Sequence, residues 1–482
     1  MRKLTLLFLG LIVVGCFSCK KKNPDPIVNG PSEVVLEGNL ESMTLDASKK
    51  YLIRNQVFVR EGKVLTIPAG TIIKGEKKTK GTLVIDRGGK IIAEGTATNP
   101  IIFTSNQEAG ERDKGDWGGI VMLGNANVNQ NNPKIEGITP EVSYGTFNST
   151  ANDDENSGIL KYVRIEYAGI ALTPNNETNS LTMGGIGRGT TIEYVQVTYG
   201  GDDGFEWFGG TVNGKYLVSH GIWDDDFDVD FGYTGKVQYA LAIRDPFNAD
   251  QSGSNGFECD NDGNGTTAQP YTAGIFSNVT IIGPQFDSTL SASSHYSGNY
   301  QHAMHLRRRT AVSIFNSVIA GFPNGFRLDG ETTEAQYTGG TGAIKNNILV
   351  TLGQRAAAKP YVAGSGNTVS SVETYWTANN VTFTSNLPAA SMPTKNGKKY
   401  GKAYDEAGID PTVIMGFTYD FRDYPANPNF ASYFTGATQT GASFSDAKLA
   451  GSFFTPTTHR GAFGGSDWTD GWANFFPQSQ AY

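Results

Sequence analysis

The feature that most constrains the fold of this chain is a stretch that repeats itself after 22 residues. Residues 194–210 align with residues 216–232 at that offset, so that aromatic residues fall on aromatic residues, acids on acids and glycine on glycine. A period of about 20 to 30 residues in strand-rich sequence is typical of a solenoid, in which each coil buries its apolar face against its neighbours. The repeat therefore predicts one long stacked unit rather than several ordinary domains.

A short alternating segment within the repeat occurs five times. Its copies are Phe205–Phe208, Phe227–Asp230, Phe257–Asp260, Met304–Arg307 and Phe326–Asp329. Alternation with a period of two indicates a strand with one buried face. If the copies stack in register, two buried columns result. One column contains Phe205, Phe227, Phe257, Met304 and Phe326, and the other contains Trp207, Val229, Cys259, Leu306 and Leu328.

The composition favours an all-β chain. The sequence contains 60 Gly, 27 Phe and 21 Tyr, which suit tight turns and aromatic-rich strands, and no segment shows a long amphipathic helical pattern. The net charge of -8 is spread along the chain, so no nucleic acid is expected as a partner. Cys259 is the only cysteine beyond residue 19, so the stability of the fold must come from stacking rather than from disulfides.

The first residues read as a targeting segment followed by a tether. Arg2 and Lys3 precede an apolar run over Leu4–Val14, which is too short to span a bilayer. The residues that end in Cys16 resemble the lipobox of bacterial lipoproteins, and those that end in Cys19 resemble its looser form in Bacteroidetes. We expect a lipoprotein signal peptide over 1–19, a lipid on Cys19 or Cys16, and a polar tether over 20–32. An ordinary secretory signal is the alternative.

Several phrases of the sequence carry a resemblance to a known family. They are Leu65–Gly75, the runs GGKIIAEGTATNPIIFTS and GDWGGIVMLGNA, and the ending over Arg460–Gly465 and Trp468–Pro477. They resemble right-handed parallel β-helix lipoproteins of Bacteroidetes, pectin-lyase-like solenoids of which most have no assigned activity. The resemblance implies a right-handed parallel β-helix over 33–386 and an irregular capping segment over 387–482. It also implies a lipid-anchored protein at the cell surface, on the outer membrane.

The outward positions of the five strand copies form two further columns. One contains Glu206, Asp228, Glu258, His305 and Arg327, and the other contains Phe208, Asp230, Asp260, Arg307 and Asp329. Acids occupy the earlier coils and bases the later ones, and stacked strands lie about 4.8 Å apart. Like charges at that spacing repel unless they are neutralised. The turns before these strands add Asp202, Asp203, Asp224, Asp225 and Asp226.

Three interpretations of these columns stay open. The acids can form a surface face that pairs with Arg307, Arg308 and Arg327. They can hold calcium, the one cofactor that the sequence suggests, because Ca²⁺ prefers clustered oxygens. The third interpretation is a ligand-binding or catalytic groove. The calcium candidates are Asp228, Asp230, Glu258 and Asp260. The ligand-binding candidates are Asp202, Asp203, Glu206, Phe208, Trp223 and Asp225.

A catalytic groove would use paired carboxylates on a glycosidic bond, or calcium together with an arginine base on a uronate. The catalytic candidates are Asp228, Asp230, Glu258, Asp260, His305, Arg307 and Arg327. No phosphate loop, zinc signature, dinucleotide fingerprint or nucleophile elbow is present in the sequence.

These observations predict a lipid-anchored binding protein of the cell envelope that captures a glycan or another nutrient at the outer membrane. The anchor and the resemblance suggest a place beside an outer-membrane transporter. A polysaccharide lyase or glycoside hydrolase acting in the acidic groove is one alternative. A structural or adhesive surface protein is the other.

Overall fold

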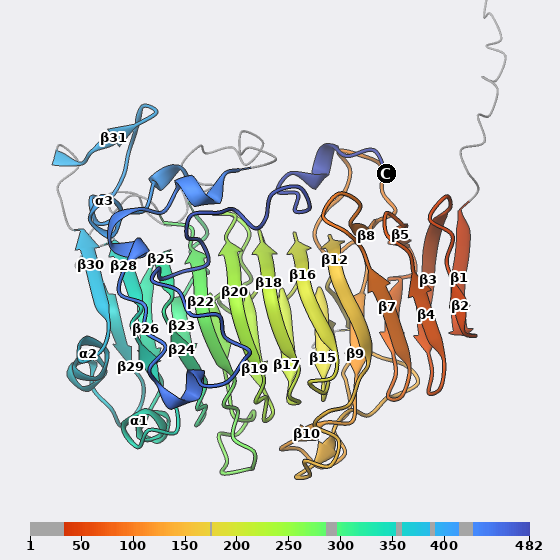
Figure 1. The fold of residues 1–482 in the computed structure, drawn as a ribbon, viewed down its shortest axis with the longest axis horizontal. Coiled ribbons are helices and arrows are strands. Elements are labelled where there is room, and N and C mark those ends of the chain that lie inside the picture. Colours follow the sequence, from red (N-terminus) through yellow and green to blue (C-terminus); the bar gives the residue numbers. More distant parts are fainter. Residues whose placement is uncertain (1–32, 174–175, 286–295, 353–358, 386–390, 414–427) are drawn as a thin grey trace, which may run out of the picture. The chain divides into compact units, whose positions relative to one another are not determined.

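The copies of the repeat stack as parallel strands and form a right-handed parallel β-helix (Figure 1). The computed structural model describes residues 33–482 apart from 174–175, 286–295, 353–358, 386–390 and 414–427. The expected signal peptide over 1–19, the tether over 20–32, and Cys16 and Cys19 with them, lie outside the described residues. The lipid anchor therefore stays a prediction.

Each coil contributes to three faces, which we call the first, second and third faces. The first contains β2 (Met43–Thr44), β4 (Val64–Ile67), β7 (Lys90–Glu94), β24 (Ser313–Phe315) and β27 (Ile344–Lys345). The second contains β5 (Ile72–Gly75), β8 (Ile101–Ser105), β25 (Val318–Phe322), β28 (Ile348–Leu352) and β30 (Val381–Ser385). The third contains β6 (Thr82–Ile85), β9 (Gly119–Leu123), β15 (Leu181–Gly184), β17 (Phe205–Phe208), β19 (Phe227–Asp230), β21 (Phe257–Cys259), β23 (His302–Leu306), β26 (Asn324–Leu328) and β29 (Lys359–Ala363).

Longer strands bend through a corner and belong to two faces. β12 (Gly158–Glu166), β16 (Thr191–Thr198), β18 (Asn213–His220), β20 (Lys236–Ile243) and β22 (Ile275–Ile282) join the first face to the second. β1 (Val34–Leu40) and β3 (Lys50–Val59) join the second to the third. Outside this sheet lie the strand pairs β10 (Asn127–Val128) with β11 (Thr146–Phe147), β13 (Ile170–Thr173) with β14 (Asn176–Thr178), and β31 (Thr394–Lys395) with β32 (Lys398–Lys399).

Helix is scarce, as the sequence predicts. The helices are α1 (Glu331–Thr338), α2 (Val369–Thr377) and α3 (Ala403–Ala407), with 3-10 turns over Pro411–Val413, Phe430–Ser432, Gly436–Gln439, Ala447–Leu449 and Pro477–Ser479. Among the described residues, none of these helices is long and apolar enough to cross a membrane.

The predicted register of the third face is confirmed. Phe227 pairs with Phe205 on one side and with Phe257 on the other, and the column continues through Met304 and Phe326. The second predicted column, from Trp207 to Leu328, follows the same pairings, and its members are buried. Alternation within the strands therefore places the core inside the coils and the acids outside.

Tyrosines mark the corner between the first and second faces. Tyr162, Tyr194, Tyr216 and Tyr239 have φ between 51° and 63°, a region that bulky residues rarely adopt. Their rings stack on one another at centroid distances of 4.3, 4.4 and 5.2 Å. In the next described coil Asn278 takes the same conformation (φ 56°), which asparagine tolerates well. Ring stacking along the corner thus compensates for the backbone strain.

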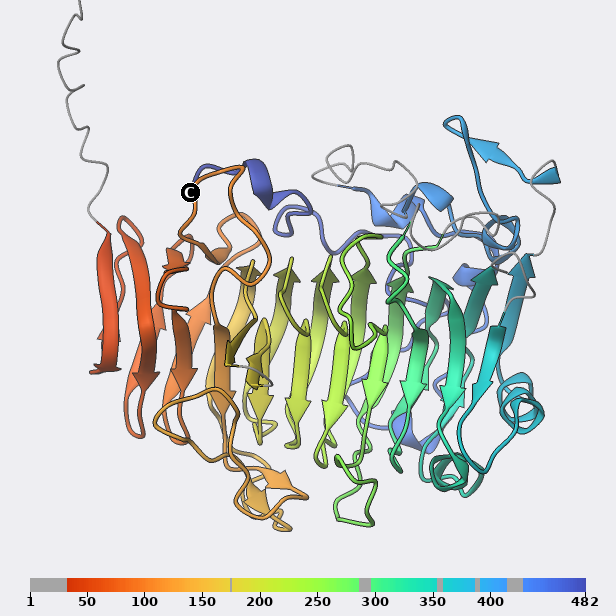
Figure 2. The same ribbon diagram turned by 180° about the vertical axis from the view of Figure 1, so that it is seen from behind.

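Much of the described C-terminal part, within the expected capping segment over 387–482, lies along the side of the stack. The buried Trp376 of α2, within the expected β-helix range, covers the core at the last coils, where its ring lies 5.0 Å from Phe326. α3 packs against β28 and β30, and the chain then runs back along the second face (Figures 1 and 2). There Gln196 exchanges two hydrogen bonds of 2.8 Å with the backbone of Asn474.

Candidate functional site

The outward columns of the third face form the candidate site, and they are more enclosed than a surface face would be. Glu206, Asp228 and Glu258 pair in succession on β17, β19 and β21, and His305 and Arg327 continue that column. Glu206 is 8% exposed and His305 is 5% exposed. These two positions are therefore enclosed, and Asn179 takes part in covering Glu206.

In the later coils the acids are neutralised by arginine. Asp260, which is 3% exposed, accepts hydrogen bonds from Arg307 Nε at 2.9 Å and Arg308 Nη1 at 2.6 Å. Arg307 also pairs with Glu258. Burial alone would raise the pKa of Glu258, but hydrogen bonding to His305 and the charge of Arg307 outweigh it, so that pKa is lowered. The ion pairs foreseen with Arg307 and Arg308 are present here.

His305 lies between two acids. Its Nδ1 is 3.5 Å from Glu258 Oε2 and its Nε2 is 3.1 Å from Asp329 Oδ2. Arg327 pairs with the same Asp329 oxygen at 3.0 Å. The hydrogen bond with His305 is the largest influence that lowers the pKa of Asp329 to about 2. Burial opposes the charged form of His305, yet its two acidic partners raise its pKa. The later half of the site is a balanced network of charges.

In the earlier coils five carboxylates converge without such partners. Asp202, Asp203 and Asp224 form one group, and Asp203, Glu206 and Asp228 form a second; we call the five residues together the acidic cluster. Within each group, one oxygen atom from every residue lies within 4.8 Å of the others. In the part of the chain that the structure describes, none of the five makes an ion pair. Asp203 belongs to both groups and links them.

Burial raises the pKa of every member of the acidic cluster. For Asp203, the neighbouring charges of Asp202 and Asp228 add to the effect of burial. The adjacent Asp230 has a pKa of about 8, because it is buried and faces Asp260. Carboxyls in such surroundings must bind either protons or a cation near neutral pH.

A hollow of about 340 Å³ lies at one end of the outward columns. Phe208 and Phe231 line it with their rings stacked at 5.6 Å, and Tyr144 lies 5.8 Å from Phe208. Glu136 completes this wall, and burial together with the charge of Glu177 raises its pKa to about 7. The hollow combines aromatic faces with a carboxyl group, which are features of a site for a polar ring.

A second hollow, of about 440 Å³, lies toward the later coils. It is lined by Arg307, Arg308 and Asp329 together with the start of α1 at Glu331. Phe208, Arg307 and Asp329 belong to one outward column, so the two hollows lie along the same direction of the stack.

The structure places the remaining candidate residues as follows. Asp225 is buried and accepts a hydrogen bond from the backbone of Asn255. Trp223 is half-buried, and Lys114 Nζ lies 5.5 Å from the centre of its ring. Of the four calcium candidates, Asp228 alone belongs to the acidic cluster, because Glu258 and Asp260 are held by arginine and Asp230 bonds the backbone of Phe231 at 2.8 Å.

Sequence reasoning missed three residues of the site, namely Glu136, Tyr144 and Asn179. Asn179 Nδ2 donates to Glu206 Oε2 and so takes part in covering the acidic cluster. Glu136 and Tyr144 belong to the insert Pro133–Ser157. The signal that could have found them is that inserts of a solenoid often gather on its binding face, since this insert interrupts the repeat.

The chemistry of the acidic cluster fits a hard divalent cation. Ca²⁺ is bound by six to eight oxygen atoms at about 2.3–2.6 Å, and oxygens within 4.8 Å of one another can share one ion. General acid–base catalysis would also be served by carboxyls with raised pKa values. Arg307 is a poor base, because Glu258 and Asp260 hold its guanidinium in its charged form.

Comparison with known proteins agrees with the fold. A family model described as a pectate-lyase-like β-helix domain matches residues 38–396 of the 482-residue chain. No curated protein and no solved structure was found to match the chain.

Proposed function

The chain belongs to the family of pectate-lyase-like β-helix domains, and from that premise we propose that it is a lipid-anchored binding protein that captures a glycan at the cell envelope. The observation that carries the proposal is the convergence of five carboxylates, two buried and three half-buried, none of which makes an ion pair with any residue that the structure describes. A bound Ca²⁺ ion balances that charge and gives an acidic glycan a point of attachment. The family membership itself supports only the fold.

The two hollows support a polymeric ligand rather than a free ion alone. Phe208, Phe231 and Tyr144 offer aromatic faces to a sugar ring on one side of the acidic cluster. On the other side Arg308, whose side chain is 43% exposed, offers guanidinium N–H donors to an oxygen of the ligand. An acidic glycan that lies along the stack would use all three regions.

The ion pairs of the later coils favour binding over catalysis. A lyase needs a base that can lose its proton, and Arg307 is held protonated by Glu258 and Asp260. His305 is likewise held between two acids. Two alternatives remain for the experiments below to distinguish. One is turnover of a glycan by a lyase or hydrolase mechanism, and the other is a purely structural or adhesive role.

Thermal unfolding tests the cation. Millimolar Ca²⁺ should raise the midpoint of the metal-free protein in a concentration-dependent way, and a chelator should reverse the rise. Asp228→Asn and Asp203→Asn should reduce the shift. The matched control is Glu41→Gln, which removes an exposed carboxylate paired with Lys63 and should leave the shift intact. Equal midpoints with calcium and with chelator would refute the cation.

Glycan binding and turnover are tested together. A uronate-rich polymer should be retained by the full chain in calcium and released by chelator, while a neutral polymer should show no such dependence. Shortened chains or new unsaturated ends would show that the protein is an enzyme instead. If the chain retains neither polymer, the structural or adhesive role becomes the better account.

The anchor has its own test. Mass spectrometry of the mature protein should find a lipid on its N-terminal cysteine, at Cys19 or Cys16. A soluble mature chain that begins beyond Lys20 would rule the anchor out. Co-purification with an outer-membrane transporter would test the proposed partner.

A further inference from the structure

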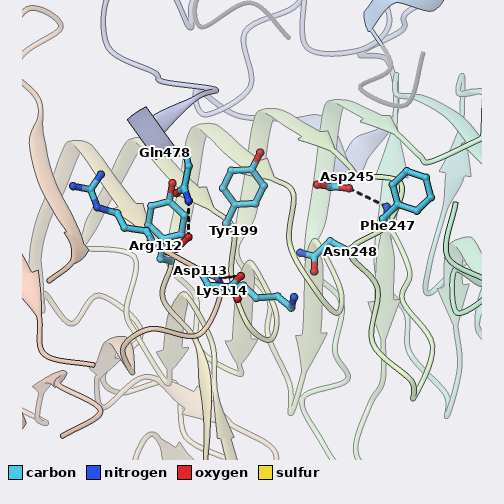
Figure 3. Close-up of a pocket in the computed structure, with 9 residues that line it drawn as sticks. Arg112, Asp113, Lys114, Tyr199, Asp245, Phe247, Asn248 and Gln478 are labelled. Atoms are coloured by element: carbon cyan, nitrogen blue, oxygen red, sulfur yellow. Dashed lines mark hydrogen bonds between the residues drawn. The ribbon is translucent and has the colours of Figure 1, made fainter. Parts of the chain in front are cut away.

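A separate cavity of about 270 Å³ lies at the corner between the second and third faces; we call it the corner pocket. Tyr199 enters it from the turn after β16, and Asp245, Phe247 and Asn248 enter from the loop after β20 (Figure 3). Tyr167, from the turn after β12, also lines it. Lys114 belongs to the loop before β9 and closes another side. None of these residues belongs to the acidic cluster.

The C-terminal segment completes the corner pocket. Gln478 lines it and donates from Nε2 to the backbone oxygen of Arg112 at 2.8 Å (Figure 3). Arg112 Nη1 in turn donates to the backbone oxygen of Pro477 at 3.1 Å. These reciprocal bonds fix one wall of the cavity, and they use the guanidinium of Arg112 for structure. The pocket is thus built by segments that are far apart in the sequence.

The pocket contains hydrogen-bonding groups that the protein itself does not use. The Tyr167 side chain is 2% exposed, and its hydroxyl has no hydrogen-bond partner in the described part of the chain. Gln478 Oε1 is buried and also lacks a partner there. Asn248 donates through Nδ2 to the Gly221 oxygen at 2.7 Å, which leaves its Oδ1 as an acceptor. Buried polar groups are usually hydrogen-bonded, so these atoms remain available to an ordered water molecule or to a polar ligand.

The aromatic side chains in the walls of the pocket can also pack against the apolar face of a ligand ring. Phe247 is 54% exposed, an unusual position for a phenylalanine, and lies beside the carboxylate of Asp245, which accepts its backbone N–H at 2.9 Å. Tyr199 forms another wall and stacks on Tyr167 at 5.8 Å. Aromatic faces next to directed polar groups recognise a ring with one apolar face and a hydroxylated edge.

The charge and the volume of the corner pocket limit the chemical class of its ligand. Arg112 and Lys114 are balanced by Asp113 and Asp245, so the pocket has no excess of positive charge for a phosphate or a uronate. Its volume lies just below the usual range of about 300–1,000 Å³ for ligand pockets. A single neutral ring with hydroxyl groups therefore fits better than an anion or a polymer segment.

We propose that the corner pocket binds one neutral sugar ring, through contact with Phe247 and hydrogen bonds to Tyr167, Asp245 and Asn248. This site goes beyond the proposed function, because it needs neither calcium nor the acidic cluster. The loop that carries Asn248 also contacts the turn before β19, where the backbone N–H of Asp250 donates to the Trp223 oxygen at 2.9 Å, next to Asp224.

The test uses the full chain, saturation-transfer NMR and a panel of monosaccharides: glucose, galactose, mannose, N-acetylglucosamine and, as the charged comparison, galacturonate. We expect at least one neutral sugar to bind in the presence of chelator, which removes any contribution from calcium. Failure of every neutral sugar, or binding of galacturonate alone, would overturn the proposal. Because chelator is present throughout, either result is independent of the outcome for the acidic cluster.

Three substitutions locate the binding. Phe247→Ala removes an exposed ring, Asp245→Asn keeps the shape, and Tyr167→Phe removes a hydroxyl that the fold does not use, so each variant should fold normally. Each should weaken sugar binding at least tenfold. Tyr233→Phe is the matched control: it removes the hydrogen bond from Tyr233 to the Val212 oxygen at 2.8 Å, should lower the unfolding midpoint, and should leave sugar binding unchanged. Unchanged affinity in Tyr167→Phe and Phe247→Ala would overturn the assignment to this pocket.

Discussion

At the scale of single residues, the acids of the third face differ in what surrounds them rather than in what they are. Asp260 and Asp228 are both outward aspartates on neighbouring coils, yet arginine holds the first, while the second faces Glu206 and Glu258. The same side chain is therefore a member of an ion pair in one coil and a candidate cation ligand in the next. The pH dependence of the free energy of unfolding measures this difference between paired and unpaired acids.

We expect the free energy of unfolding of the metal-free protein to fall as the pH rises from about 5 to 8. The pKa of Asp230 is about 8 in the folded chain and has an ordinary value of 3.8, so within this range the folded form holds a proton that the unfolded form has lost. His305 acts in the same direction, because its raised pKa gives stability that is lost as the pH rises. Urea unfolding at several pH values measures the slope.

The pH range excludes the contribution of Asp329, and a variant of Asp230 serves as the control. Asp329 has a pKa of about 2, below its ordinary 3.8, so its contribution is lost only at lower pH, outside this range. Asp230→Asn should make the slope shallower. Burial lowers the pKa of His220 to about 3 and that of His302 to about 2, which acts in the opposite direction below about pH 6.5, so the slope between pH 7 and 8 decides. A stability that increases over that upper part of the range would show that the acids of the third face are ionised in the metal-free protein.

The sequence predicts the direction of each side chain on the third face but not its burial. Phe227 and Cys259 could be placed in the core from alternation alone, since the period of a strand fixes which face a residue takes. The enclosure of Glu206 depends on Asn179, which lies outside the repeat. Contacts of that kind follow from tertiary packing and leave no periodic signal in the sequence. The sequence therefore could not distinguish the acids that pair with arginine from those that do not.

At the scale of elements, the corner between the first and second faces depends on a column of identical rings. Each tyrosine there occupies a backbone region that costs an ordinary residue roughly 1–2 kcal/mol. Trp472 from the C-terminal segment meets Tyr162 and Tyr194 edge-on at 6.0 and 5.9 Å. The corner is therefore stabilised both along the stack and from outside it.

Two substitutions of Tyr194 should separate strain from stacking. Tyr194→Asn removes two stacked ring pairs, each worth about 0.5–1.5 kcal/mol, but asparagine tolerates φ 54°. Tyr194→Val loses the same rings and adds backbone strain, so it should be the more destabilising variant although valine is more apolar. The midpoints of urea unfolding decide the order. Equal loss in both variants would mean that the strain at this corner is small.

At the scale of the whole molecule, the last residues join distant parts of the stack. Tyr482 donates its hydroxyl to Glu166 Oε1 at 2.8 Å, and Gln478 bonds Arg112. Glu166 is buried, and burial raises its pKa despite the nearby Arg164. The sequence predicted an irregular C-terminal segment, but its path could not be foreseen, because side-chain contacts such as that between Gln196 and Asn474 follow no repeat.

Removal of residues 478–482 should therefore affect stability and the corner pocket together. The buried Glu166 loses a donor, which should cost about 1–3 kcal/mol, and the pocket loses the wall formed by Gln478. Binding of neutral sugar should be lost, while the calcium-dependent shift of the acidic cluster should persist. Gln480→Ala, at an exposed position, is the control and should change neither. A truncated chain that binds sugar normally would contradict this role of the C-terminus.

The bond between Gln478 and Arg112 also has a consequence for the order of events in the cell. The two residues are 366 positions apart, and ribosomes add about 5–20 residues per second, so roughly 20 to 70 seconds separate their synthesis. Early coils can stack as they emerge, since each needs only its neighbour. The corner pocket cannot close until Gln478 has been synthesised and has emerged from the ribosome. A chain released prematurely would then be folded over much of its length and yet unable to hold the sugar.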